Sequence, residues 1–197
     1  LAVDLAQRGQ RVLLLDNDDR LSTGSRAICF AKRTLEIWDR LGVADPLCGR
    51  AVQWHVGRGY FGEREVYRFD LLPEAGHERP AFINLPQYYA EAMLAVRAAE
   101  VPNLEIRWKN SVVGCTPRSD GATLTIDTPE GRYEIDAAYV IACDGSRSPL
   151  RAMLGLETQG RVFRDRFLIA DITMDAPAFP VERRFWFDPP FHPGQSV

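Results

Sequence analysis

Cysteine and histidine are both scarce in this sequence, and neither is spaced as it is in metal sites. The chain of 197 residues has 4 cysteines and 3 histidines, and it contains no CxxC motif. They are scattered along the chain, at Cys29, Cys48, His55, His77, Cys115, Cys143 and His192. Zinc sites and disulfide frameworks use closely and regularly spaced ligands or pairs. We therefore expect no metal site and no disulfide framework, and the scattered cysteines favour the reducing cytoplasm.

Long apolar runs and an excess of one charge are also missing. No apolar run approaches the roughly 20 residues that a transmembrane helix needs. A net charge of only −3 gives no electrostatic footprint for nucleic acid or for an anionic membrane surface. Residues 1–8 lack the basic start and the small-residue cleavage site of a signal peptide. We therefore expect no nucleic-acid partner and no membrane association, and the composition is that of an ordinary globular protein.

The familiar groupings of catalytic side chains are absent as well. The sequence has no GxSxG or HExxH motif and no Ser/His/Asp or Cys/His grouping. These groupings carry nucleophilic and metal-dependent catalysis. Their absence fits an enzyme whose cofactor does the difficult chemistry, while the protein positions and shields it.

The first sixteen residues have the pattern of half a nucleotide-binding unit. Residues 1–8 predict a short helix with Gly9 as its cap, and residues 11–15 (RVLLL) predict a strand buried on both faces of a parallel sheet. Asp16 follows at once, where a carboxylate can accept hydrogen bonds from both hydroxyls of an adenosine ribose. The same pattern also fits an ordinary αβ unit that ends in a solvated aspartate, and these residues alone do not decide.

Both ends of the chain look unfinished. Leu1 opens directly in helical pattern without an initiating methionine, and Val197 stops in a loop soon after the strand-like residues 183–187. The glycine-rich phosphate loop of a nucleotide-binding unit lies about 20 residues before its acid, which would place it before Leu1. We therefore expect this chain to be an internal fragment.

Three further motifs occur in a fixed order. Residues 22–42 read STGSRAICFAKRTLEIWDRLG, residues 84–87 read NLPQ and lead into a helix over 87–99, and residues 144–151 read DGSRSPLR. The last motif follows residues 139–143 (YVIAC), which predict a buried strand. In this order the motifs resemble the FAD-dependent aromatic-ring hydroxylases, the class A flavoprotein monooxygenases. The resemblance covers essentially the whole chain and is greatest to the 3-(3-hydroxyphenyl)propionate and phenol hydroxylases.

The resemblance implies roles for individual residues. It implies that Arg26 reaches the FAD pyrophosphate, where a guanidinium presents fixed donors. It implies that Gln87 contacts the ribityl and phosphate region, although Gln87 alone could be a simple helix-start residue. It also places a turn near the pyrophosphate and the approach of the nicotinamide, and the residues of this turn are Asp144, Gly145, Arg147 and Arg151. No catalytic side chain is identified.

Elementary rules predict the local form of the third and the first motif. Gly145 permits a tight turn, Asp144 can bond backbone N–H groups in it, and Ser148 can cap a helix that has Pro149 at its first position. In the first motif, the spacing predicts a helix that ends at Gly42. The apolar residues Leu35, Trp38 and Leu41 would share its buried face.

The segments between the motifs predict antiparallel structure. Residues 51–70 alternate as a half-buried hairpin and 71–79 form a loop. Short strands over 104–108, 111–116, 123–128 and 132–136 predict a meander inserted between the nucleotide-binding strands. Residues 167–174 and 183–187 predict strands of a second antiparallel sheet. In the hairpin, Trp54, His55 and Tyr60 either pack its core or face an aromatic substrate, and the loop at 188–193 (DPPFHP) is a candidate pocket wall.

The predicted fold class is therefore α/β. It comprises an FAD-binding, Rossmann-like parallel sheet of the glutathione-reductase type, an inserted antiparallel meander, and the start of an α+β substrate domain. Residues 1–50 and 87–160 would form the FAD-binding part, and residues 51–86 and 161–197 the pieces of the substrate domain.

Three hypotheses about function follow. The first is a monooxygenase that uses FAD, NAD(P)H and O2 to hydroxylate a phenolic substrate, with a homodimer of the full-length protein left open. The second is an FAD-dependent reductase or a halogenase of the same fold. The third concerns the fragment alone, which without its phosphate loop should bind FAD weakly or not at all and be inactive.

Overall fold

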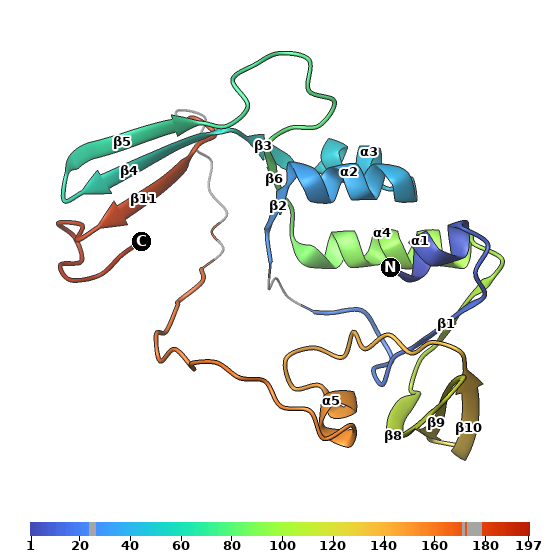
Figure 1. The fold of residues 1–197 in the computed structure, drawn as a ribbon. Coiled ribbons are helices and arrows are strands. Elements are labelled where there is room, and N and C mark those ends of the chain that lie inside the picture. Colours follow the sequence, from blue (N-terminus) through green and yellow to red (C-terminus); the bar gives the residue numbers. More distant parts are fainter. Residues whose placement is uncertain (24–26, 171, 173–178) are drawn as a thin grey trace.

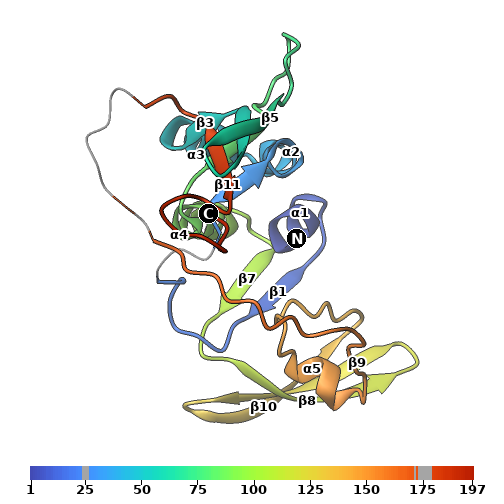
Figure 2. The same ribbon diagram turned by 90° about the vertical axis from the view of Figure 1, so that its left-hand side faces the viewer.

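The computed structural model describes residues 1–23, 27–170, 172 and 179–197. Its first layer is a pair of parallel strands, β1 (Val12–Leu15) and β7 (Leu104–Arg107), paired from Val12 with Leu104 to Leu15 with Arg107. Helix α1 (Ala2–Gln7) contacts β1, and helix α4 (Gln87–Ala99) contacts β7 (Figures 1 and 2). The predicted bounds of α4 are confirmed.

The start of the chain confirms one prediction and corrects another. Gly9 has a φ of +85° and donates its N–H to Ala6, so it ends the first helix as expected. Strand β1, however, is half-buried and Leu14 is 38% exposed. The prediction of burial on both faces is wrong because β7 is the only neighbour of β1 among the described strands.

Two helices form the second part of the core. Helix α2 (Lys32–Leu41) ends at Gly42, which has a φ of +80°, and helix α3 (Ala44–Arg50) follows. The predicted apolar face of α2 is confirmed, since it buries Leu35, Trp38 and Leu41. They pack in one cluster with side chains of α1, α3 and α4.

A small antiparallel sheet joins the first motif to the NLPQ motif. Its order is β2 (Cys29–Ala31), β6 (Phe82–Asn84) and β3 (Val52–Trp54). Ile83 lies in the centre of β6, pairs with both neighbouring strands and is 0% exposed. This sheet brings residues of the first motif beside those that shortly precede Gln87.

A second three-stranded sheet has the order β11 (Arg183–Phe187), β4 (Val56–Phe61) and β5 (Arg64–Asp70). The predicted antiparallel hairpin is confirmed as β4 and β5, but Val66 on its second strand is 44% exposed. Strand β11 lies parallel to β4, so the predicted antiparallel sheet for residues 183–187 is wrong. An alternating pattern predicts a strand without fixing the direction of its partner.

The meander has three strands, β8 (Ser111–Arg118), β9 (Gly121–Thr128) and β10 (Gly131–Ala137), all antiparallel. Residues 104–108 were predicted to be its first strand, which is wrong because β7 pairs with β1 instead. Helix α5 (Pro149–Met153) packs against β8, and Figure 2 shows this unit beyond the carboxyl ends of β1 and β7.

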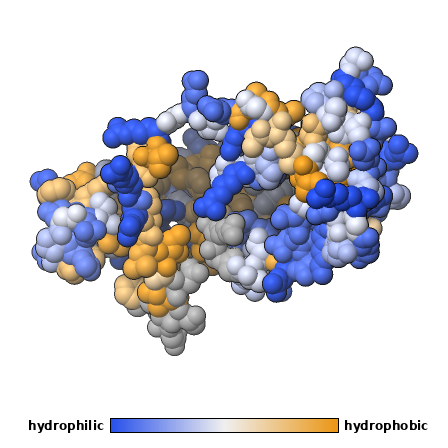
Figure 3. Space-filling model, turned by 90° about the horizontal axis from the view of Figure 1, so that it is seen from below, coloured by the Kyte–Doolittle hydropathy of each residue, from blue (hydrophilic) through white to orange (hydrophobic). Residues whose placement is uncertain are grey.

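Two predicted strands do not form. Residues 139–143 make no ladder and Tyr139 is 90% exposed, so the predicted buried strand is wrong. Of residues 167–174, the described ones (167–170 and 172) are also unpaired, and Leu168 is 96% exposed. An apolar run becomes a strand only where a neighbour bonds its backbone, and no described strand pairs with either run. Hydrophobic areas accordingly remain at the surface in Figure 3.

Candidate functional site

Asp16 lies in an exposed loop directly after β1. Its Oδ1 accepts the N–H of Asp18 at 2.9 Å. Among the described residues its Oδ2 takes part in no hydrogen bond. A carboxylate oxygen that remains open at the carboxyl end of a parallel strand is what a ribose hydroxyl requires.

The loop that contains Asp16, here called the acid loop, is held in place by the turn between β7 and β8. The N–H of Asp16 donates to the carbonyl of Arg107 at 3.1 Å, and its carbonyl accepts the N–H of Asn110 at 2.9 Å. The N–H of Lys109 donates to the carbonyl of Asp18 at 2.9 Å. Asn110 in turn accepts a hydrogen bond from the hydroxyl of Tyr133 on β10. The meander therefore helps to position the acid.

The first turn of α4 contacts the chain that follows the acid loop. The N–H of Gln87 donates to the carbonyl of Ala27 at 3.2 Å, and its side-chain amide donates to Glu91. Glu91 also accepts the N–H of Ser22 at 3.0 Å. Arg26 lies outside the described residues, but its neighbour Ala27 is thus bonded directly to Gln87.

The third motif forms the turn that elementary rules predict. Gly145 has a φ of +80°, and Oδ2 of Asp144 accepts the N–H of Leu150 at 3.0 Å. Ser148 caps α5 by accepting the N–H of Arg151 at 3.0 Å. The guanidinium of Arg151 donates to the carbonyl of Ser146 at 2.7 Å, so this side chain also braces the turn.

The hydroxyl of Ser148 also donates to Asp144. This bond, with the N–H of Leu150, holds the pKa of the Asp144 carboxyl below its ordinary value. At pH values above the ordinary pKa of an aspartate, the ionised Asp144 carboxylate therefore stabilises the turn. That contribution is lost as the pH falls through the lowered pKa.

Replacing Ser148 with alanine should raise the pKa of Asp144 toward its ordinary value and cost about 1 kcal/mol of local stability, because it removes both the cap and the hydroxyl donor. NMR titration of the Asp144 carboxyl and hydrogen exchange at the Arg151 amide measure the two effects. The control is Ser146→Ala, since the turn uses only the carbonyl of Ser146. An unchanged pKa of Asp144 in Ser148→Ala would contradict this description.

Packing and hydrogen bonds bring the predicted positions toward the carboxyl end of β1. Leu15, directly before Asp16, packs in one cluster with Leu150 of α5. The Ser22–Glu91 bond connects the chain after the acid loop to α4. Among the described residues no hydrogen bond joins Asp16, Gln87 and Asp144 directly, and their roles toward a cofactor remain predictions.

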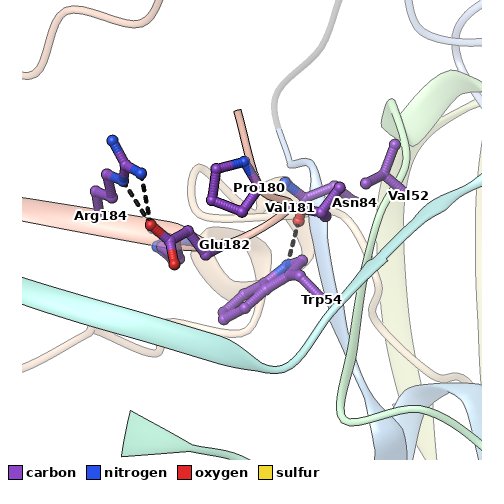
Figure 4. A pocket seen from close by; sticks show the side chains of 8 residues that line it. Val52, Trp54, Asn84, Pro180, Val181, Glu182 and Arg184 are labelled. Carbon is purple, nitrogen blue, oxygen red and sulfur yellow. Dashed lines mark hydrogen bonds and ion pairs between the residues drawn. The ribbon is translucent and has the colours of Figure 1, made fainter. Parts of the chain in front are cut away.

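A pocket of about 350 Å³ lies between the two small sheets (Figure 4). Its lining residues are Val52, Trp54, Asn84, Pro180, Val181, Glu182, Arg183 and Arg184. Of these, Trp54 and Asn84, the first residue of the NLPQ motif, were singled out from the sequence. Trp54 packs, at 7% exposed, against Phe82 with ring centroids 4.9 Å apart. Arg183 belongs to no motif, and the fold places it in the same pocket as Asn84.

The described parts of the chain contain neither a candidate membrane span nor a candidate metal site. Within these ranges no helix is both long and apolar enough to cross a bilayer. The same ranges contain no group of three or more side chains arranged to bind a metal ion. The four cysteines are free thiols.

A parallel strand pair flanked by helices, with an acid loop at its carboxyl end, is the arrangement of a nucleotide-binding α/β protein. Residues 1–190 match the family described as "FAD binding domain". The chain therefore belongs to this family, and the predicted family resemblance is confirmed.

Named relatives agree with this assignment. The chain is 30% identical over 184 residues to a flavin-dependent monooxygenase of Mycobacteroides abscessus. This match covers 89% of this chain and 38% of that protein. It is 26% identical over 183 residues to a 3-(3-hydroxy-phenyl)propionate/3-hydroxycinnamic acid hydroxylase of Mycobacterium sp. (strain JLS), covering 91% of this chain and 31% of that protein. The chain thus spans about a third of the length of these curated relatives.

A solved structure has the same fold over most of the chain. The crystal structure of p-nitrophenol 4-monooxygenase from Pseudomonas putida superimposes with a TM-score of 0.76 at 27% identity. The match covers 82% of this chain and 42% of the other. The mixed architecture of a parallel pair and antiparallel sheets is therefore that of FAD-dependent monooxygenases.

Proposed function

We propose that this chain is the FAD-binding part of a monooxygenase that hydroxylates an aromatic ring with NAD(P)H and O2. The observation that carries the proposal is the family match over residues 1–190. The names of the relatives, two of them hydroxylases or monooxygenases of phenolic compounds, support the reaction. The four free thiols are consistent with a place in the cytoplasm.

The residues at the carboxyl end of β1 suit a dinucleotide. Asp16 would accept the ribose hydroxyls through its open Oδ2, and the first turn of α4 at Gln87 offers a favourable dipole for phosphate. Arg147 is exposed and forms no ion pair among the described residues, so its charge is available to a phosphate. We assign Arg26 to the pyrophosphate as well, and Asp144, Gly145 and Arg151 to the turn beside it.

These residues bind and orient, and the cofactor supplies the redox chemistry with NAD(P)H and O2 when it is bound. We further propose that β1 and β7 belong to a larger Rossmann-like sheet of the glutathione-reductase type. The order of helix, glycine, parallel strand and acid supports this reading. Residues 51–86 and 161–197 are proposed to build the substrate domain, because β4 and β11 pair in one sheet.

The test uses the protein expressed from the complete open reading frame. We expect it to purify with FAD, and to oxidise NAD(P)H faster when a phenolic acid is present, with matching O2 uptake and one hydroxyl added to the ring. Mass spectrometry of the product distinguishes the alternatives. A halogenated product, or NAD(P)H oxidation without oxygen in the product, would assign a different reaction to the same fold.

A further inference from the structure

Both backbone groups of Asp16 are bonded to the segment that leads from β7 into β8. The N–H of Asp16 donates to the carbonyl of Arg107 at 3.1 Å, and its carbonyl accepts the N–H of Asn110 at 2.9 Å. The acid thus has one hydrogen bond on each side of its own Cα atom. The path of the acid loop therefore depends on where Arg107 and Asn110 lie.

The side chains of these two residues meet at one hydroxyl, that of Tyr133 on β10. Nη1 of Arg107 donates to this hydroxyl at 3.1 Å, and the hydroxyl donates to Oδ1 of Asn110. A phenol can accept one hydrogen bond while it donates another. The guanidinium carbon of Arg107 also lies 5.7 Å from the centroid of the Tyr133 ring. Tyr133 therefore joins the two residues to which the backbone of Asp16 is bonded.

The partners of this hydroxyl are themselves held by other groups. Nε of Arg107 donates to Glu105 at 2.7 Å, and Nδ2 of Asn110 donates to the carbonyl of Trp108 at 2.7 Å. The half-buried Tyr133 ring packs against the buried cluster of the meander and α5. A phenylalanine ring would fill the same space, so the hydroxyl adds the two hydrogen bonds and no packing.

We propose that the Tyr133 hydroxyl is a positioning group for the acid loop, and that the affinity of the protein for FAD depends on it. The proposal rests on the proposed function, because it takes Asp16 to accept the ribose hydroxyls. By joining Arg107 and Asn110, the hydroxyl restricts the conformations that the acid loop can adopt before the cofactor binds. A preorganised site loses less conformational freedom on binding and therefore binds more tightly.

The test variant is Tyr133→Phe, which removes the hydroxyl and keeps the ring. In the protein from the complete open reading frame we expect it to weaken FAD binding about five-fold, the effect of one net hydrogen bond. Fluorescence titration of the flavin-free protein measures the dissociation constant. Hydrogen exchange followed by mass spectrometry should be faster in the peptide that contains Asp16. An FAD affinity equal to that of the unaltered protein would overturn the proposal.

Combining this change with Asp16→Ala distinguishes positioning from a general loss of stability. If Tyr133 acts through the acid, Tyr133→Phe should change FAD affinity by less than about two-fold in protein that already lacks the carboxylate. Two independent losses would instead multiply in the double variant. That result would show that Tyr133 does not act through Asp16, and it would overturn the proposal.

The matched control is Thr123→Val, which removes a hydroxyl from the other end of the same meander. Thr123 pairs with Asp136, whereas Tyr133 pairs with Ile126. The Thr123 hydroxyl also joins two side chains, since it donates to Asp136 at 2.6 Å and accepts from Arg118 at 2.9 Å. FAD affinity should stay within about two-fold in this variant. A loss equal to that of Tyr133→Phe would contradict a specific role for Tyr133.

A second variant, Asn110→Ala, removes the acceptor of the same hydroxyl and keeps the backbone N–H that bonds Asp16. It should cost about the same affinity as Tyr133→Phe, with no added loss when the two are combined. If Asp16→Ala weakens FAD binding while Tyr133→Phe and Asn110→Ala do not, only the role of Tyr133 is overturned. Protein from the complete open reading frame that binds no FAD would overturn the proposed function itself.

Discussion

Replacing Asp16 with alanine should weaken FAD binding by the protein from the complete open reading frame about 10- to 100-fold. The change removes a carboxylate proposed to accept the ribose hydroxyls, and hydrogen bonds to a charged group contribute about 1.5–3 kcal/mol. Each 1.4 kcal/mol corresponds to about ten-fold in affinity. Fluorescence titration of the flavin-free protein with FAD measures the dissociation constant.

The matched control is Asp19→Ala in the same loop. Asp19 is an exposed acid that pairs with Lys109 at 3.3 Å, and exposed ion pairs contribute about 1 kcal/mol or less to stability. Its loss removes the same charge from the loop and should change FAD affinity less than about three-fold. If the two variants bind FAD equally well, Asp16 does not hold the ribose.

Replacing Ile83 with alanine should lower the free energy of unfolding by about 2–5 kcal/mol, because deleting a fully buried aliphatic side chain leaves a cavity. Ile83 is 0% exposed and pairs with Phe30 of β2 and Gln53 of β3. The same strand leads into Gln87, so the bond between Gln87 and Ala27 should loosen as well. Urea unfolding followed by circular dichroism measures the loss.

Val66→Ala is the control for this change. Val66 lies on β5 and is 44% exposed, and substitutions at such positions usually stay within about 0.5 kcal/mol. A loss at Ile83 no larger than the loss at Val66 would show that the β2–β6–β3 sheet is not part of the cooperative core.

Local features could be predicted from the sequence because their causes are local. The helix that begins at Gln87, the left-handed Gly42 and the cap at Ser148 each depend on residues within a few positions. The apolar face of Leu35, Trp38 and Leu41 follows from helical spacing alone. The family resemblance came from the same kind of short motif.

The pairing of distant strands could not be predicted in this way. Strand β7 has the composition of a meander strand, and only its position in space makes it the parallel partner of β1. The bond between Arg183 and Cys29 joins residues 154 positions apart, and no local pattern marks either of them for this contact. Residues 139–143 show the converse, since an apolar run without a described neighbour stays unpaired.

A crystal structure of the protein from the complete open reading frame with FAD tests the central claim most directly. We expect the Asp16 carboxylate within about 3 Å of the adenosine ribose hydroxyls, Arg26 at the pyrophosphate, and Gln87 and the Asp144 turn lining the same groove. A flavin nucleotide bound elsewhere, with these four groups facing separate surfaces, would contradict the account.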